Sequence, residues 1–272
     1  MNMAYLSPTL NVMLSAAKKT GRVLIRDFGE VEQLQVSLKG TNDFVSAADT
    51  KAEQTLYREL KKARPDFGFL LEEGGAEEGH DKSSRWIIDP LDGTINFLHG
   101  IPHFSISIAL ERDSEIVAGA IYHPVADELY YAEKGGGTYL NDRRLRVSAR
   151  RRVEESVLAT GIPFLGRPGH GRFLTELQTV MAHSAGVRRM GSAALDLAYV
   201  AAGRYDGYWE RNLSPWDVAA GTLIVREAGG YVSEVEGGRN PVFTGSILAT
   251  NDHLHKPLGD LLRSVGKSEG DG

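Results

Sequence analysis

The spacing of apolar residues changes part-way along this chain, and that change limits the folds that it can adopt. Before about residue 145, several short segments alternate apolar and polar side chains, as residues 104–110 do. An alternation with a period of two is typical of strands in an antiparallel sheet. From about residue 153, short apolar strands alternate with longer segments of helical period, which is typical of an α/β arrangement. The sequence therefore predicts an α+β first half and an α/β second half.

We expect this change of period to separate two lobes. Residues 1–145 are predicted to form a lobe with an antiparallel sheet, and residues 146–265 an α/β lobe. Residues 266–272 are polar and follow the last predicted helix, so we expect them to be a disordered tail. The polar stretch 76–84 is expected to be a mobile loop. A chain of 272 residues is long enough for two lobes that share an interface.

Capping residues and proline or glycine stops define the predicted elements. The predicted helices are 7–28, 50–64, 172–183, 191–202, 215–227 and 254–265. The predicted strands are 67–71, 86–88, 104–110, 116–122, 128–132, 157–160, 187–190, 205–210, 231–235 and 246–250.

Composition excludes several kinds of site and partner. The chain contains no cysteine, which rules out disulfides, thiolate catalysis and cysteine-ligated metals. Its net charge of −5 gives no general attraction for nucleic acid. The basic stretch 143–152 lacks interleaved aromatic residues, which favours a solvated surface over a contact with RNA or a protein. There is no apolar run of membrane-spanning length and no signal-peptide pattern, so we expect a cytoplasmic protein without a membrane or nucleic-acid partner.

Residues 86–97, Trp-Ile-Ile-Asp-Pro-Leu-Asp-Gly-Thr-Ile-Asn-Phe, are the most informative segment. The apolar run is predicted to stop at Asp89, because Pro90 lacks the N–H that a strand ladder needs. Asp89 and Asp92 then lie at a strand end, followed by Gly93, which lets a ligand approach the backbone closely. Ligands of α/β proteins bind at such strand ends, and Mg²⁺ prefers carboxylate, phosphate and water oxygens. Capping of backbone N–H groups is the alternative role for either aspartate.

Four further carboxylates lie at the ends of predicted strands or the starts of predicted helices. Each has an ordinary alternative role, because an acidic residue caps a helix, interacts favourably with its dipole, or lies in solvent at a turn. They are Glu72 after strand 67–71, Asp49 at the N-cap of helix 50–64, Glu210 at the end of strand 205–210, and Asp217 in the first turn of helix 215–227.

Several segments together resemble the inositol monophosphatase family, the Mg²⁺-dependent, lithium-sensitive sugar phosphatases. Residues 86–97 resemble the first signature of that family. Residues 214–221, Ser-Pro-Trp-Asp-Val-Ala-Ala-Gly, are similar to its second signature. Residues 191–194, Gly-Ser-Ala-Ala, resemble the segment whose backbone lines the sugar pocket in relatives. The correspondence runs from about residue 43 to residue 230 with the motifs in order, and it departs at Leu71 and Gly74, where relatives carry glycine and serine.

This resemblance implies a fold, a cofactor and a set of site residues. The fold implied is a layered αβαβα sandwich, and the protein implied is a homodimeric phosphomonoesterase with two or three Mg²⁺ ions. The implied metal ligands are Glu72, Asp89, the carbonyl of Leu91, Asp92 and Asp217. The implied catalytic residues, which orient the attacking water, are Asp49 and Thr94. The implied substrate contacts are Asp92, Gly93, Thr94, Gly191, Ser192, Ala193, Glu210 and Asp217.

The implied substrate is inositol 1-phosphate or a similar polyol or sugar phosphate. The same chemistry on histidinol phosphate, fructose 1,6-bisphosphate or a 3′-phosphonucleotide stays open. A non-enzymatic regulator that keeps the fold as a binding surface is a further alternative. Such a regulator would be expected to have lost metal ligands, whereas every expected carboxylate is present in this chain.

Overall fold

The structure is a computed structural model that describes residues 6–30, 36–39 and 43–265. The predicted tail, residues 266–272, lies outside the described residues. A two-stranded ribbon of β1 (Val36–Lys39) and β2 (Asp43–Ser46) precedes two larger sheets. None of the helices in the described part of the chain is both long enough and apolar enough to cross a lipid bilayer.

The first large sheet has eight strands, and all but one pair of neighbours run antiparallel. The exception is the parallel pairing of the third and fifth strands of the chain, which the sequence did not indicate. In spatial order the strands are β10 (Arg143–Arg144), β9 (Gly137–Leu140), β8 (Glu128–Glu133), β7 (Glu115–His123), β6 (Ser105–Arg112), β5 (Asp81–Asp92), β3 (Phe67–Leu71) and β4 (Gly75–Glu77).

The second large sheet has five strands and is mixed. In spatial order the strands are β12 (Gly186–Arg188), β11 (Val157–Thr160), β13 (Gly207–Arg211), β15 (Ser246–Thr250) and β14 (Tyr231–Ser233). Strand β11 runs parallel to both of its neighbours, β12 and β13, whereas β15 runs antiparallel to both β13 and β14.

The helices begin and end close to the predicted positions. At the first of them the Oγ atom of Ser7 accepts a hydrogen bond from the N–H of Leu10 at 3.1 Å, and Pro8 occupies the first turn, as capping preferences require. The helices are α1 (Pro8–Phe28), α2 (Ala47–Ala63), α3 (Thr94–Leu98), α4 (His170–Met181), α5 (Ala193–Ala201), α6 (Pro215–Glu227), α7 (Pro241–Thr244) and α8 (Asp252–Val265), with a short 3₁₀ turn at Val153–Glu155.

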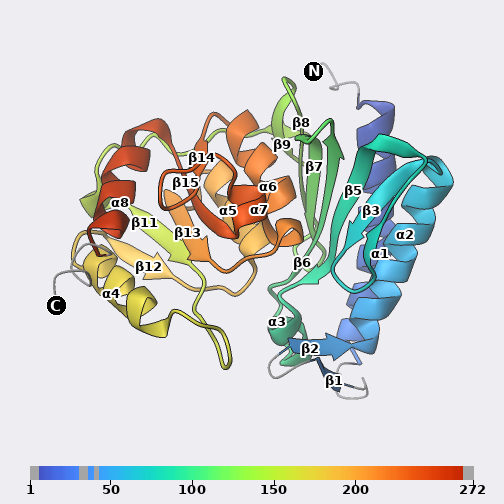
Figure 1. The fold of residues 1–272 in the computed structure, drawn as a ribbon, viewed down its shortest axis with the longest axis horizontal. Coiled ribbons are helices and arrows are strands. Elements are labelled where there is room, and N and C mark those ends of the chain that lie inside the picture. The colour runs from blue at the N-terminus through green and yellow to red at the C-terminus, as the bar shows by residue number, and fades with distance from the viewer. Residues whose placement is uncertain (1–5, 31–35, 40–42, 266–272) are drawn as a thin grey trace.

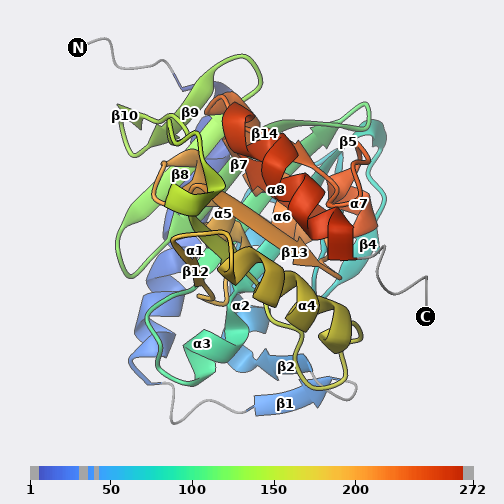
Figure 2. The same cartoon turned by 90° about the vertical axis from the view of Figure 1, so that its left-hand side faces the viewer.

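Figure 1 shows that the helices and sheets stack in five layers. Helices α1 and α2 cover the outer face of the eight-stranded sheet, and α5 and α6 lie between the two sheets. Helices α4 and α8 cover the outer face of the five-stranded sheet, as Figure 2 shows from that side. The mixed, layered αβαβα fold expected from the family resemblance is therefore confirmed.

Small residues allow the middle helices to approach their neighbours closely. A Cβ atom added to Gly119 on β7 would lie 2.9 Å from the carbonyl oxygen of Ala220 on α6, and one added to Gly221 would lie 2.4 Å from Leu197 on α5. Such distances are well inside van der Waals contact, so a larger residue would push the layers apart. One apolar core runs through this layer, from Ile87 of the first sheet to Ala249 of the second.

Two local predictions are wrong. The stretch 76–84 is not an irregular loop, because β4 ends within it and β5 begins at Asp81. Polar side chains there belong to strand residues that are largely exposed, so the polarity that suggested a loop reflects an exposed part of the sheet. Strand β5 also does not stop at Asp89 but continues through Pro90 to Asp92.

Candidate active site

A cavity of about 450 Å³ lies where the two large sheets approach each other. Most of the predicted site residues line it, and they come from segments far apart in the sequence. These lining residues are Glu72, Asp92, Gly93, Thr94, Gly191, Ser192, Ala193, Glu210 and Asp217. The other three predicted residues are buried, with exposed fractions of 1% for Asp49, 2% for Asp89 and 0% for Leu91.

A β-bulge gives Asp89 and Asp92 a common orientation. Residues three apart on a regular strand point to opposite faces of the sheet. Here Asp89 pairs with Ser107 and Asp92 pairs with Ser105, so the bulged strand contains one residue more than its partner. Because Ser105 and Ser107 share a face, Asp89 and Asp92 do too. Pro90 lies inside this bulge, where its missing N–H interrupts no regular ladder.

The start of helix α5 fixes the Asp92 carboxylate. Its Oδ2 atom accepts hydrogen bonds from the hydroxyl of Ser192 and, at 2.8 Å, from the N–H of Ala194. Ser192 is also the N-cap of α5. Burial raises the pKa of Asp92, but these donors limit the rise to about 6. The segment 191–194 therefore positions an acidic side chain of the other sheet, a role that the sequence did not indicate.

Among the other acidic residues, the pKa values rise further than that of Asp92. Burial raises the pKa of Glu72 to about 9, and the nearby charges of Asp49 and Asp217 add to the rise. Burial raises the pKa of Asp217 to about 8, with a further contribution from Asp92. The pKa of Asp89 is raised well above its usual range by burial, then by Glu72 and Asp92. These side chains therefore form one acidic cluster with a strong mutual repulsion, in which Asp89 is buried and Glu72, Asp92 and Asp217 are half-buried.

The acidic cluster is not closed around a central point. Within residues 6–30, 36–39 and 43–265, no group of three or more Asp, Glu or His side chains is arranged so that it could already hold a metal ion. Several side chains are engaged elsewhere: Asp89 accepts a hydrogen bond from the N–H of Leu91 at 2.9 Å, and Asp217 accepts one from the N–H of Ser214 at 2.7 Å. Binding a cation would require some of these carboxylates to reorient.

Thr94 and Gly93 lie beside the acidic cluster at the start of the short helix α3. The hydroxyl of Thr94 donates a hydrogen bond to the carbonyl of Leu91 at 2.9 Å. Gly93 has a φ of 93°, and an added Cβ would lie 3.1 Å from the carbonyl oxygen of His103. Both the positive φ and the close approach require glycine at this position.

The prediction that Asp49 is an N-cap is wrong, because α2 begins at Ala47 and Asp49 lies in its first turn.

Comparisons with known proteins identify the family of this chain. The model of the inositol monophosphatase family matches residues 5–267. The chain belongs to the inositol monophosphatase family. An inositol-1-monophosphatase of Mesorhizobium japonicum is 61% identical over 96% of this chain and 97% of its own. The Nus factor SuhB of Escherichia coli K12 is 42% identical over 92% of this chain and 94% of its own.

A solved structure is similar over nearly the same length. The crystal structure of the extragenic suppressor protein suhB from Bartonella henselae has a TM-score of 0.92 and 59% identity, covering 94% of this chain and 99% of that chain. The layered fold of this chain is therefore that of a family with solved members.

Glu210 lies on β13 and lines the same cavity as Asp92 and Asp217. Its Oε2 atom accepts a hydrogen bond from the hydroxyl of Tyr208 at 2.5 Å. A Cβ added to Gly161 would lie 1.9 Å from the Glu210 carboxyl group, so the glycine makes room for it. Burial raises the pKa of Glu210 to about 7. Glu210 is thus partly buried and held in place, unlike a mobile surface glutamate.

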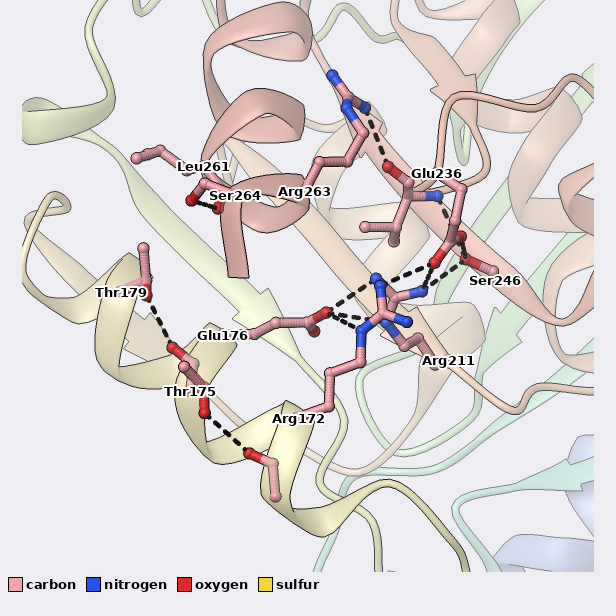
Figure 3. A network of polar contacts seen from close by, with 12 residues as sticks. Arg172, Thr175, Glu176, Thr179, Arg211, Glu236, Ser246, Leu261, Arg263 and Ser264 are labelled. Carbon is pink, nitrogen blue, oxygen red and sulfur yellow. Dashed lines mark hydrogen bonds and ion pairs between the residues drawn. The ribbon is translucent and has the colours of Figure 1, made fainter. Parts of the chain in front are cut away.

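A network of charged side chains supports this part of the cavity wall and was not predicted (Figure 3). Glu176 on α4, which is 1% exposed, accepts hydrogen bonds from Arg172 at 3.0 Å and from Arg211 at 2.8 Å. Arg172 and Arg211 both also pair with Glu236. Because Arg211 directly follows Glu210, the network ties the position of that strand end to α4. The sequence shows a glutamate four residues after an arginine, which is helical spacing, but it does not show that this glutamate is buried.

Asp196 is a second residue of the cavity wall that the sequence reasoning missed. It is 1% exposed and lies in the middle of α5. The signal was present, because Asp196 is the single charged residue in a helix composed otherwise of alanine, leucine, valine and tyrosine.

Proposed function

We propose that this protein is a Mg²⁺-dependent phosphatase that hydrolyses inositol 1-phosphate, or a similar polyol phosphate, to the free alcohol and inorganic phosphate. The observation that carries the proposal is the bulge in β5, which turns Asp89 and Asp92 to one face of the sheet, in the same acidic cluster as Glu72 and Asp217. Family membership and the inositol-1-monophosphatase name of the 61% identical relative support the reaction and the substrate.

The chemistry of the acidic cluster fits Mg²⁺. All of its candidate donors are hard oxygen atoms, which this ion prefers. Burial and mutual repulsion oppose ionisation of Glu72, Asp89 and Asp217, and a divalent cation would remove that opposition. Glu72, Asp89 and the Leu91 carbonyl would hold one ion, and Asp89, Asp92 and Asp217 a second. A site for two or three ions is therefore part of the proposal.

Bound Mg²⁺ supplies charge neutralisation for the phosphate and lowers the pKa of water. The residues of the chain would position the phosphate, the attacking water and the alcohol. The backbone N–H groups of Gly93 and Thr94 would receive phosphate oxygens, and the Thr94 hydroxyl, with Asp49, would orient the attacking water. Glu210 and the Ala193 backbone would contact the alcohol. Because water attacks phosphorus directly, the scheme needs no covalent phosphoenzyme.

Other members of the enzyme class and one non-enzymatic role compete with this proposal. Histidinol phosphate, fructose 1,6-bisphosphate and 3′-phosphonucleotides would use the same acidic cluster. The Nus factor name of the 42% identical relative favours a regulatory role as the second candidate. Retention of all the expected carboxylates favours catalysis over regulation alone.

Phosphate release from a panel of monoesters tests the proposal. With Mg²⁺ present, inositol 1-phosphate should be hydrolysed with the highest kcat/KM among these substrates. EDTA should abolish release and added Mg²⁺ should restore it, while Asp89→Asn should remove activity and leave thermal unfolding close to that of the parent. Full activity in EDTA would contradict the metal role, and no release from any monoester would favour the regulatory alternative.

Three further expectations extend the proposal, of which the first two come from the family resemblance and the third from the absence of a signal-peptide pattern. We expect uncompetitive inhibition by Li⁺, a homodimer in solution and a cytoplasmic location. Titration with Li⁺ at several substrate concentrations, and light scattering at the concentration of the assay, measure the first two. The departures at Leu71 and Gly74 lie beside Glu72, so any change in Li⁺ sensitivity relative to relatives should be traced there first.

A further inference from the structure

The cavity wall beside Glu210 contains a second carboxyl group, that of Asp196. Asp196 lies one helical turn after Ala193 on α5, the helix whose first residues hold Asp92. Its flanking residues, Leu195 and Leu197, are both 0% exposed. A carboxyl group in this position is set in an apolar helix and reaches a polar cavity.

One oxygen of the Asp196 carboxyl group has no partner in the part of the protein that the structure describes. Within the described residues its Oδ1 atom is buried and has no hydrogen-bond partner. A buried polar atom without a hydrogen-bond partner lowers the stability of the fold, and an ionised carboxylate without a partner lowers it further. Native proteins rarely keep such a group unless something else binds it. Because Asp196 also lines the cavity, a ligand bound there is the candidate partner.

The surroundings also favour the neutral form of this carboxyl group. Burial raises the pKa of Asp196 well above its usual range, and the nearby charges of Glu210 and Asp92 raise it further. The guanidinium of Arg189 acts in the opposite direction, as the smallest of these effects. A protonated carboxyl group is a hydrogen-bond donor, whereas Glu210, which already accepts from Tyr208, acts as an acceptor.

We propose that Asp196 is a specificity-determining residue that, as a neutral carboxylic acid, donates a hydrogen bond to a hydroxyl oxygen of the polyol substrate. The inference rests on the proposed function. A hydroxyl group both donates and accepts hydrogen bonds. Asp196 as donor and Glu210 as acceptor together recognise neighbouring hydroxyl groups of the substrate. An aryl phosphate such as p-nitrophenyl phosphate has no hydroxyl group, and a site built for hydroxyls penalises a substrate that lacks them.

The competing explanation is that Asp196 only packs in α5. A packing role predicts a loss of stability on substitution without any change in substrate preference. The informative quantity is therefore the ratio of kcat/KM for inositol 1-phosphate to kcat/KM for p-nitrophenyl phosphate, measured with Mg²⁺ for the parent and each variant.

Two substitutions separate donation from packing. Asp196→Ala removes the donor and should lower the ratio about tenfold, as expected for one hydrogen bond. Asp196→Asn keeps an N–H donor and should hold the ratio within about threefold of the parent. Asp196→Leu repeats the loss with a larger side chain, in case the alanine variant does not fold. Asp206→Ala is the matched control, because Asp206 is buried outside the cavity and accepts from the N–H of Val157 at 2.8 Å; it should lower stability and leave the ratio unchanged.

The outcomes distinguish this inference from the proposed function. A parent that hydrolyses neither substrate overturns the proposed function. A parent that is active, with an unchanged ratio in Asp196→Ala or Asp196→Leu, overturns only the role of Asp196. A ratio that falls equally in Asp196→Asn and Asp196→Ala overturns the assignment of a neutral donor. A fall in the alanine variant with retention in the asparagine variant supports it.

Discussion

Asp92 shows how hydrogen bonds give similar carboxyl groups different pKa values. It lies in the same acidic cluster as Glu72 and Asp217, yet its pKa is raised only to about 6, against about 9 and about 8 for the other two. The difference arises because Ser192 and Ala194 donate to it. Donors to the charged form offset the cost of burial, so carboxyl groups that share one cavity have different pKa values.

Thr94→Ala tests the water-orienting role. Its hydroxyl contacts the Leu91 carbonyl at 2.9 Å, so its loss should cost about 0.5–1.5 kcal/mol of stability. If the hydroxyl also orients water, kcat should fall by roughly a hundredfold, the lower range for a positioned proton-transfer group. Steady-state kinetics with saturating Mg²⁺ measures this. Thr94→Ser keeps the hydroxyl and should retain most of kcat; an alanine variant with the parent's kcat would show that the role is wrong.

Glu210→Gln tests recognition of the alcohol. The amide keeps the shape of the side chain but loses the charge that strengthens hydrogen bonds from substrate hydroxyls. We expect KM for inositol 1-phosphate to rise roughly tenfold, the equivalent of about 1.5 kcal/mol, with a much smaller change for p-nitrophenyl phosphate. The Mg²⁺ concentration for half-maximal activity should not change. Equal effects on both substrates would mean that Glu210 is only a structural group at a strand end.

At the scale of elements, the sequence predicted what depends on local periodicity and missed what depends on pairing. Helix α1 and strand β15 were found almost to the residue. Strand β5 was predicted to stop before Pro90, because a proline in a regular ladder would leave a hydrogen bond unmade. The bulge that accommodates Pro90 depends on the pairing register between β5 and β6, and no local sequence pattern shows that register. The candidate metal ligands were recognisable by signature, whereas Asp196 and Glu176 required knowledge of burial.

Glu176→Gln tests the support that α4 gives to the cavity wall. Glu176 is 1% exposed and accepts from two arginines, so removing its charge should destabilise the protein by about 2–4 kcal/mol, as for breaking a buried pair. Urea unfolding measures the change. Glu236→Gln is the matched control, because the Glu236 side chain is 46% exposed, and the substitution should cost about 0–1 kcal/mol. A cost for Glu176→Gln no larger than the control's would contradict a supporting role.

For the whole molecule, a buried histidine pair predicts how stability depends on pH. His103 and His123 lie with ring centroids 5.6 Å apart, and burial followed by the charge of His123 lowers the pKa of His103 to about 4. In the unfolded chain its pKa is near 6.5. The unfolded state therefore binds a proton first as pH falls, so this contribution to stability is present above about pH 6.5 and is lost between about 6.5 and 4.

The variant His103→Phe should make thermal unfolding less dependent on pH in that range, by roughly 1–3 kcal/mol between the two ends. The site carboxyl groups, whose pKa values are raised, contribute with the opposite sign, so the informative quantity is the difference between parent and variant. His80→Phe, at an exposed position, is the control. A pH dependence in His103→Phe identical to the parent's would contradict the effect.

The helical layer between the sheets also determines when the first sheet becomes covered during synthesis of the chain. The inner face of the eight-stranded sheet is complete once β10 has been made, yet helix α6, which packs against β5 to β9, ends only at Glu227. An apolar sheet face left uncovered is prone to association with other chains. A nascent chain that has emerged only as far as residue 145 would therefore hold its first sheet unprotected, and we expect its release from the ribosome to yield aggregates or chaperone-bound material rather than a soluble lobe.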